Sequence, residues 1–200
     1  MKSTCIFLLS FISVIGLQVS AANIGEPAPN FSLKNTAGET VTLEEYAGKL
    51  VVLEWTNHEC PFVKKHYNSG NMQTLQKNYS NEDVVWLSII SSAPGKQGHI
   101  SGETADELTN TRNATPSHVL FDPEGTTGRQ YKAKTTPHMY VIGKEGKLLY
   151  NGAIDSIKSA DPADIPKANN YVDQTLKEIM AGKQISKPLT RPYGCSIKYG

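Results

Sequence analysis

The chain has almost no excess of charge of either sign, with 20 lysines and arginines against 19 aspartates and glutamates. Proteins that bind nucleic acid or anionic membrane surfaces usually concentrate positive charge, so this balance argues against both classes of partner. The sequence also has no internal repeat and no low-complexity tract. Its length of 200 residues fits one folded domain with a core of its own.

Cysteine is scarce, with three residues in the chain, Cys5, Cys60 and Cys195. The residue three positions after Cys60 is Val63, so the sequence has no Cys-x-x-Cys motif there. A dithiol built within one helical turn is therefore excluded. Any partner for Cys60 has to come from a distant part of the chain.

The N-terminus carries an apolar run that is too short to span a bilayer. Lys2 precedes this run, which extends from Cys5 to Leu17, and small residues follow it up to Ala22. This order is typical of a secretory signal peptide, so we predict that residues 1–21 are removed on export. No cysteine lies at the cleavage point, which argues against a lipoprotein membrane anchor. The prediction implies a periplasmic or secreted protein.

Cleavage would leave a domain of residues 22–200 with two cysteines in an oxidising compartment. An even number of cysteines in such a compartment suggests a disulfide between Cys60 and Cys195. The final part of this domain, from about residue 155, lacks strong periodicity until a helix pattern at residues 171–180. We therefore predict a C-terminal extension from about residue 155 to residue 200, which holds Cys195.

Hydrophobic patterning predicts alternating strands and helices. An N-terminal β-hairpin is expected around the turn at Ala37–Gly38, and a buried strand is expected at Leu50–Trp55. A helix from Pro61, broken or kinked around residues 68–71, and a strand at Val84–Ile90 complete a βαβ unit with parallel strands. The remaining expected elements are a helix at 103–112, a strand at 118–121, a hairpin of 139–142 with 147–150, and a helix at 171–180.

Cys60 lies where the first buried strand gives way to a helix. The free backbone amides and the dipole of a helix N-terminus stabilise an anion, so this position favours a thiolate. His58, Lys64 and Lys65 would add to this effect, and Glu59 would oppose it. The alternative is a buried and inert thiol, which is common for free cysteines.

Several motifs together resemble a known family. They are Gly25-x-x-Ala28-Pro29-x-Phe31-x-Leu33, Cys60-Pro61 and Thr136-Pro137, in this order and over nearly all of the predicted mature chain. They resemble the thioredoxin superfamily and, within it, the peroxiredoxin-like AhpC/TSA redoxins. The resemblance implies an α/β thioredoxin-like fold, in which helices flank a central mixed sheet that follows an N-terminal β-hairpin. It also implies a cis-proline at Pro137 that faces the reactive cysteine.

A subgroup of redoxins also shares Asn57-x-x-Cys60-Pro-Phe-Val63 and the C-terminal run from Gly194 to Tyr199. Peroxiredoxins usually place a threonine three residues before the reactive cysteine, where this chain has Asn57; Thr56 lies one position away. They also use an arginine to polarise the peroxide, and no arginine follows Pro137 in the next strand. These departures leave both peroxides and disulfides open as substrates.

The resemblance implies an antioxidant, thiol-dependent oxidoreductase. Cys60 would attack a peroxide or a disulfide, Cys195 would resolve the product, and a thiol reductant protein would complete the cycle. The implied supporting residues are Thr56, Asn57, His58, Thr136, Pro137 and His138, with the two histidines as proton donors. No cofactor or metal is required, and the oligomeric state stays open.

Three alternatives remain at this point. The protein is a thiol-disulfide oxidoreductase without peroxidase activity, or a copper-handling protein that uses Cys60, His58 and His138 as ligands, or a redox-inactive binding module. Cys195 has its own alternative, a permanent disulfide that holds the tail in place.

Overall fold

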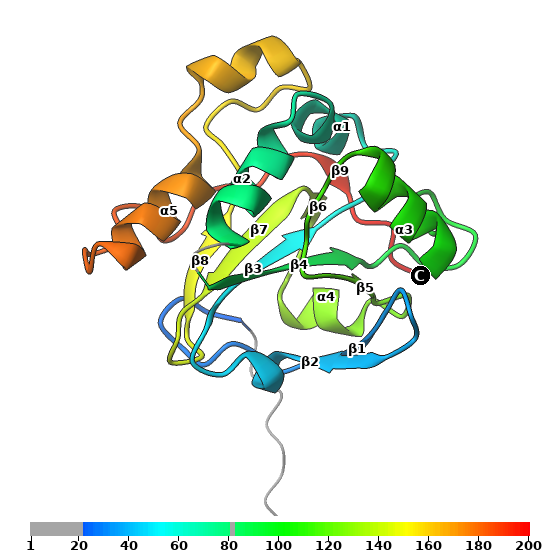
Figure 1. Ribbon diagram of the computed structural model, residues 1–200, viewed down its shortest axis with the longest axis horizontal. Coiled ribbons are helices and arrows are strands. Elements are labelled where there is room, and N and C mark those ends of the chain that lie inside the picture. Colours follow the sequence, from blue (N-terminus) through cyan, green and yellow to red (C-terminus); the bar gives the residue numbers. More distant parts are fainter. Residues whose placement is uncertain (1–21, 81–82) are drawn as a thin grey trace, which may run out of the picture.

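The computed structural model describes residues 22–80 and 83–200. The predicted signal peptide, with Cys5, lies outside these residues. Seven strands form one mixed sheet in the order β2-β1-β5-β4-β3-β7-β8 (Figure 1). Their bounds are β1 Ser32–Asn35, β2 Thr40–Thr42, β3 Leu50–Trp55, β4 Val84–Ile90, β5 His118–Phe121, β7 His138–Ile142 and β8 Leu148–Gly152. The thioredoxin-like α/β fold predicted from the sequence is confirmed.

The centre of the sheet follows from the hydrophobic runs. β3 is buried at every position and pairs in parallel with β4 and antiparallel with β7. Strands with both faces buried read as continuous apolar segments, which is how β3 and β4 appear in the sequence. Both predicted hairpins are present, one formed by β1 and β2 and the other by β7 and β8.

Helices and loop segments cover the two faces of the sheet. The helices are α1 Pro61–Asn68, α2 Asn71–Ser80, α3 Gly102–Thr111, α4 Thr126–Gln130 and α5 Tyr171–Met180, with short 3-10 helices η1 Leu43–Tyr46 and η2 Pro162–Lys167. One core cluster packs α1, α2 and α5 against one face, and it includes Cys60 and Tyr193. The other cluster, which includes Trp55 and Tyr140, fills the opposite face. The break expected in the helix around residues 68–71 is present, and it separates α1 from α2.

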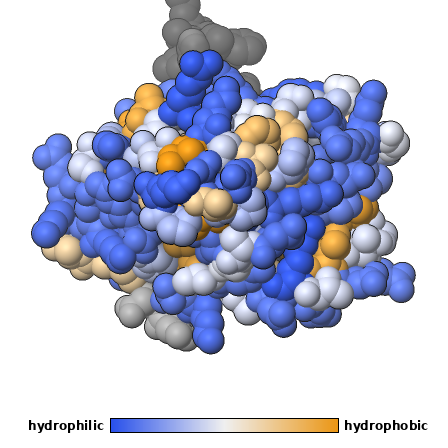
Figure 2. Space-filling model, turned by 90° about the horizontal axis from the view of Figure 1, so that it is seen from above, coloured by the Kyte–Doolittle hydropathy of each residue, from blue (hydrophilic) through white to orange (hydrophobic). Residues whose placement is uncertain are grey.

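The C-terminal segment returns to the sheet, as the expected pairing of Cys195 with Cys60 requires, but the short strand that it forms was not predicted. In Figure 1 the red tail runs from α5 to the end of the sheet, where β9 Cys195–Ser196 lies beside β6 Thr135–Thr136. These two short strands pair antiparallel, with Thr136 opposite Cys195. The face seen from above is mostly hydrophilic, with apolar residues in small separate patches (Figure 2). The apolar side chains of the helices on this side are used mainly in the core.

A carboxyl group is completely buried in the central strand. Glu54 accepts hydrogen bonds from Trp86 Nε1 at 2.9 Å, from the Tyr67 hydroxyl at 3.0 Å and from the Ser88 hydroxyl at 3.2 Å. Burial raises the pKa of Glu54 above its usual 4.5, although these hydrogen bonds act in the opposite direction. A raised carboxyl pKa means that the fold favours the protonated form.

This burial predicts how stability depends on pH. The stabilising effect of protonated Glu54 is present below its usual pKa and is lost as pH rises through its raised folded value. We expect Glu54→Gln to remove this loss, so that the stability of the wild type relative to the variant falls as pH rises above 4.5. Urea unfolding at a series of pH values measures it. Glu54→Leu is the control, and it should cost about 1–3 kcal/mol for each buried donor left without an acceptor. A pH-independent difference between wild type and Glu54→Gln would contradict the argument.

Candidate active site

The loop between β3 and α1 places Cys60 at the start of the helix. Cys60 is the N-cap residue of α1, and Pro61 occupies the first helical position, where its missing N–H costs nothing. Asn57 closes the turn before it: the carbonyl of Asn57 accepts from the Cys60 amide at 3.1 Å, and its Oδ1 accepts from the Glu59 amide at 2.9 Å. Asn57 therefore shapes the loop that presents the cysteine.

The second cysteine lies against the first. Cys60 Sγ is 2.7 Å from Cys195 Sγ and 3.1 Å from the carbonyl oxygen of Thr136. The peptide bond between Thr136 and Pro137 is cis. Both cysteines are free thiols, and Cys60 is completely buried whereas Cys195 is half-buried. Residues 135 positions apart in the sequence thus form one dithiol.

The two sulfurs differ in acidity. Burial raises the pKa of Cys60, but the neighbouring Cys195 thiol, Thr136 and the Val63 amide outweigh it, so the pKa of Cys60 falls below the usual 9.0. Burial and the neighbouring Cys60 raise the pKa of Cys195 to about 11. Cys60 ionises first, and the Cys195 thiol then donates to its thiolate.

The predicted basic helpers of Cys60 lie elsewhere. Lys65 is buried and contacts Asp155 Oδ2 at 3.2 Å, in a cluster separate from the sulfurs. The groups that lower the pKa of Cys60 are hydrogen-bond donors. The thiolate therefore depends on the helix start and on the tail.

His138 does not face Cys60. It lies on the same face of β7 as Tyr140, and its ring packs 4.6 Å from the Tyr140 ring, within the core cluster opposite Cys60. Its Nδ1 accepts from the Lys134 amide, and its Nε2 lies 2.8 Å from Asn151 Oδ1. Burial lowers the pKa of His138 to about 4, so the ring is neutral near pH 7. This geometry suits a structural residue.

Thr56 and His58 line a small cavity beside α3. The cavity has a volume of about 40 Å³, and Ile90, Ala105 and Leu108 are among the apolar residues that line it. His58 Nδ1 is buried there without a hydrogen-bond partner, and the His58 carbonyl accepts from Arg112 Nη2 at 3.3 Å. Burial lowers the pKa of His58, so this ring too is mostly neutral.

Metal ligation finds no support in the part of the chain that the structure describes. Those residues contain no group of three or more His, Cys, Asp or Glu side chains that could hold a metal ion. His138 and Cys60 lie on opposite faces of the sheet, so the three copper ligands expected from the sequence, Cys60, His58 and His138, do not come together. None of the helices in residues 22–80 and 83–200 is long and apolar enough to span a membrane.

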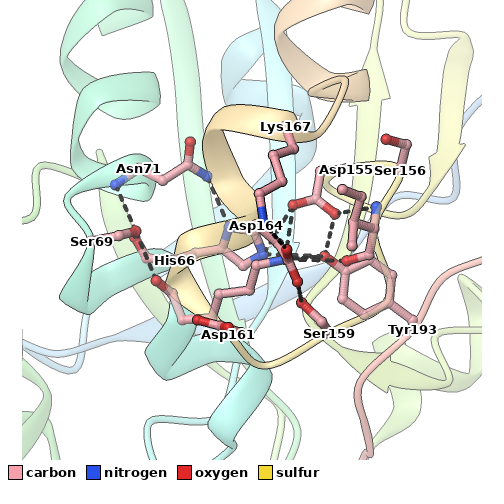
Figure 3. Close-up of polar contacts among 12 residues, drawn as sticks. His66, Ser69, Asn71, Asp155, Ser156, Ser159, Asp161, Asp164, Lys167 and Tyr193 are labelled. Atoms are coloured by element: carbon pink, nitrogen blue, oxygen red, sulfur yellow. Dashed lines mark hydrogen bonds and ion pairs between the residues drawn. The ribbon is translucent and has the colours of Figure 1, made fainter.

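A buried polar cluster holds the tail just before Cys195, and sequence reasoning missed it. The Tyr193 hydroxyl donates to Asp155 Oδ1 and lies 3.5 Å from Lys65 Nζ and 3.4 Å from His66 Nε2 (Figure 3). All four side chains are buried. The sequence signal for this cluster was the pair Lys65–His66 in an amphipathic helix. Without knowledge of the fold, this pair reads as part of the solvent-exposed face of the helix.

Comparison with known proteins agrees with this architecture. Thioredoxin-like protein YneN of Bacillus subtilis (strain 168) is 26% identical over 124 residues, which are 62% of this chain and 68% of that protein. An uncharacterized conserved protein from Geobacillus kaustophilus superposes with a TM-score of 0.76 at 24% identity and covers 89% of this chain and 93% of its own. The exposed lipoprotein thioredoxin of Streptococcus pneumoniae has a TM-score of 0.52 at 25% identity, covering 74% of this chain and 98% of its own.

The family assignment rests on a match to a family model. The model of the AhpC/TSA family matches residues 24–151, which contain the β3–α1 loop with Cys60 and the cis-proline. Cys195 lies beyond the matched region. The chain belongs to the AhpC/TSA family and is an oxidoreductase with a thioredoxin-like fold.

Proposed function

We propose that this protein is a thiol-disulfide oxidoreductase whose redox pair is Cys60 and Cys195. The observation that carries the proposal is the 2.7 Å contact between two free thiols of unequal acidity beside a cis-proline. Cys60 supplies the thiolate and Cys195 supplies the second sulfur. The pair takes the place of the Cys-x-x-Cys motif that the sequence lacks.

The exchange needs no cofactor. In the oxidised protein, a substrate thiolate attacks one sulfur of the Cys60–Cys195 bond, forms a mixed disulfide and releases the other sulfur as a thiolate. A second substrate thiolate then displaces the protein sulfur, so two electrons pass from the substrate to the protein. The reverse sequence reduces a substrate disulfide, and a thiol protein of the exported compartment resets the pair.

Peroxide reduction is the second candidate, and the burial of Cys60 favours it, since a small oxidant enters more easily than a protein disulfide. The thiolate would attack the peroxide bond, giving a sulfenic acid and water or alcohol, and Cys195 would condense with it to a disulfide and water. The groups that tune Cys60 include no arginine to polarise a peroxide. Disulfide exchange therefore ranks first.

One experiment separates the candidates. Reduced protein is mixed with glutathione disulfide and, separately, with hydrogen peroxide, and free thiols and sulfur products are followed by mass spectrometry. We expect glutathione disulfide to yield a Cys60–Cys195 link, and peroxide to react no faster than it does with free cysteine. Fast peroxide consumption with sulfenic acid at Cys60 would select peroxidase activity. If neither oxidant links the two cysteines, the redox proposal is wrong.

The acidity difference predicts coupled titrations. Wild-type protein should show one thiol transition below the usual value of 9.0 and a second near 11. Cys195→Ala removes a donor to the thiolate, so the pKa of Cys60 should rise; Cys60→Ala removes the neighbouring charge, so the pKa of Cys195 should fall. Ultraviolet absorbance of the thiolate measures both. Transitions that stay in place in the two variants would show that the sulfurs are not coupled.

Gly194 permits the approach of the tail. Its φ is +137°, and a Cβ atom there would lie 2.0 Å from the carbonyl oxygen of Thr136. We expect Gly194→Ala to disturb the pairing of β9 with β6 and to make the Cys60–Cys195 disulfide about tenfold easier to reduce at equilibrium with glutathione. Gly182→Ala is the matched control, since Gly182 also has a positive φ but nothing within 4 Å. Equal equilibrium constants in Gly194→Ala and Gly182→Ala would show that the disulfide does not depend on Gly194.

A further inference from the structure

The two sulfurs differ in access as well as in acidity. Cys60 is completely buried, in the core cluster under α1, and Cys195 is half-buried on β9. Disulfide exchange requires a nucleophile to reach one sulfur along the axis of the bond that breaks. A bulky thiol can reach Cys60 only if the tail moves aside.

On its N-terminal side, Cys195 is held by the buried cluster of Figure 3. Tyr193, two residues before it, donates to Asp155, which also pairs with Lys65 at 3.2 Å. The Tyr193 ring packs edge-on against Phe62 of α1, with ring centroids 5.8 Å apart. Lifting this part of the tail would leave the charges of Lys65 and Asp155 short of a partner inside the protein, which is costly.

On its C-terminal side, the tail is held again. The Tyr199 hydroxyl donates to the carbonyl of Ala133 at 2.9 Å, and the Arg129 guanidinium lies 4.8 Å from the centre of the Tyr199 ring. The Lys198 carbonyl accepts from the Ala93 amide at 2.9 Å. The tail beside Cys60 is therefore fixed on both sides of Cys195, and Cys195 is the more exposed of the two cysteines.

We propose that substrate thiols exchange with this protein at Cys195 Sγ, and that Cys60 stays covered and serves as the internal sulfur. This inference rests on the proposed redox pair and adds which of its two sulfurs meets the substrate. Cys60 thus carries the stabilised thiolate, and Cys195, from a distant part of the chain, meets the substrate.

The chemistry balances with Cys60 as the leaving group. A substrate thiolate attacks Cys195 Sγ, the Cys60–Cys195 bond breaks, and its electron pair stays on Cys60, whose acidic thiol makes it the better leaving group. The second substrate thiolate attacks the substrate sulfur of the mixed disulfide and releases Cys195. Cys195 takes up a proton because its pKa is about 11, and the other substrate proton goes to water.

The same asymmetry gives the exchange a direction. The reduced protein keeps a stabilised thiolate at Cys60, and stabilising the reduced form makes a disulfide more oxidising. Cys195, by contrast, is mostly protonated near pH 7 and attacks substrate disulfides slowly.

The test maps the first adduct. Oxidised full-length protein is mixed with excess glutathione, quenched with acid after short times, and digested for mass spectrometry at low pH. We expect the glutathione adduct on Cys195 and a free thiol on Cys60, in an excess of about tenfold over the reverse arrangement. An adduct found mainly on Cys60, or equally on both, overturns the inference. A protein that never forms the Cys60–Cys195 disulfide refutes the proposed function itself, which is a distinguishable result.

A second measurement covers adducts too short-lived to trap. Cys60→Ser and Cys195→Ser variants are each charged with glutathione at high pH, and the release of this glutathione by external labelled glutathione is followed at pH 7. Release from Cys195 should be about tenfold faster than release from Cys60. Similar rates, or faster release from Cys60, would again overturn it.

Discussion

The approach of the C-terminal tail to the cis-proline loop is the constraint on which the site depends. β9 pairs with β6, so that Cys195 lies opposite Thr136, whose carbonyl oxygen is 3.1 Å from Cys60 Sγ. Gly194 makes this approach sterically feasible because any side chain there would collide with Thr136. Without the tail, Cys60 would be a single buried thiol at a helix start, with neither a second sulfur nor the donor that lowers its pKa.

Acidity and exposure are divided between the two cysteines. A single-motif dithiol keeps both sulfurs on one helical turn, whereas here one sulfur lies in the core and the other on a tail that is fixed on both sides. The helix start stabilises the thiolate of Cys60. The tail places the more exposed Cys195 directly against Cys60. If the tail bound less firmly, the difference in acidity and exposure between Cys60 and Cys195 would be lost.

Buried polar groups are the structural cost of this arrangement. Lys65 and Asp155 form an ion pair with almost no solvent exposure, and Tyr193 completes its hydrogen bonds. Such a pair adds little stability by itself, but removing one partner leaves a charge uncompensated. Its geometry therefore selects one position of the tail. His66 stays neutral beside it, since burial lowers the pKa of His66 to about 4.

The sequence by itself determined the sheet and the placement of Cys60, because local periodicity and turn residues encode strands, helices and the helix start. β4 and α5 were predicted residue by residue, as Val84–Ile90 and Tyr171–Met180. Only the tertiary structure decided what surrounds the sulfur. The count of two cysteines suggested that Cys195 meets Cys60, but the strand pairing that brings Cys195 there was not predicted. This pairing and the cluster around Lys65 join residues far apart in the chain, and no periodic pattern records such contacts. The same reason explains His138: its position next to the cis-proline was readable, but the face to which its ring turns depended on the strand register.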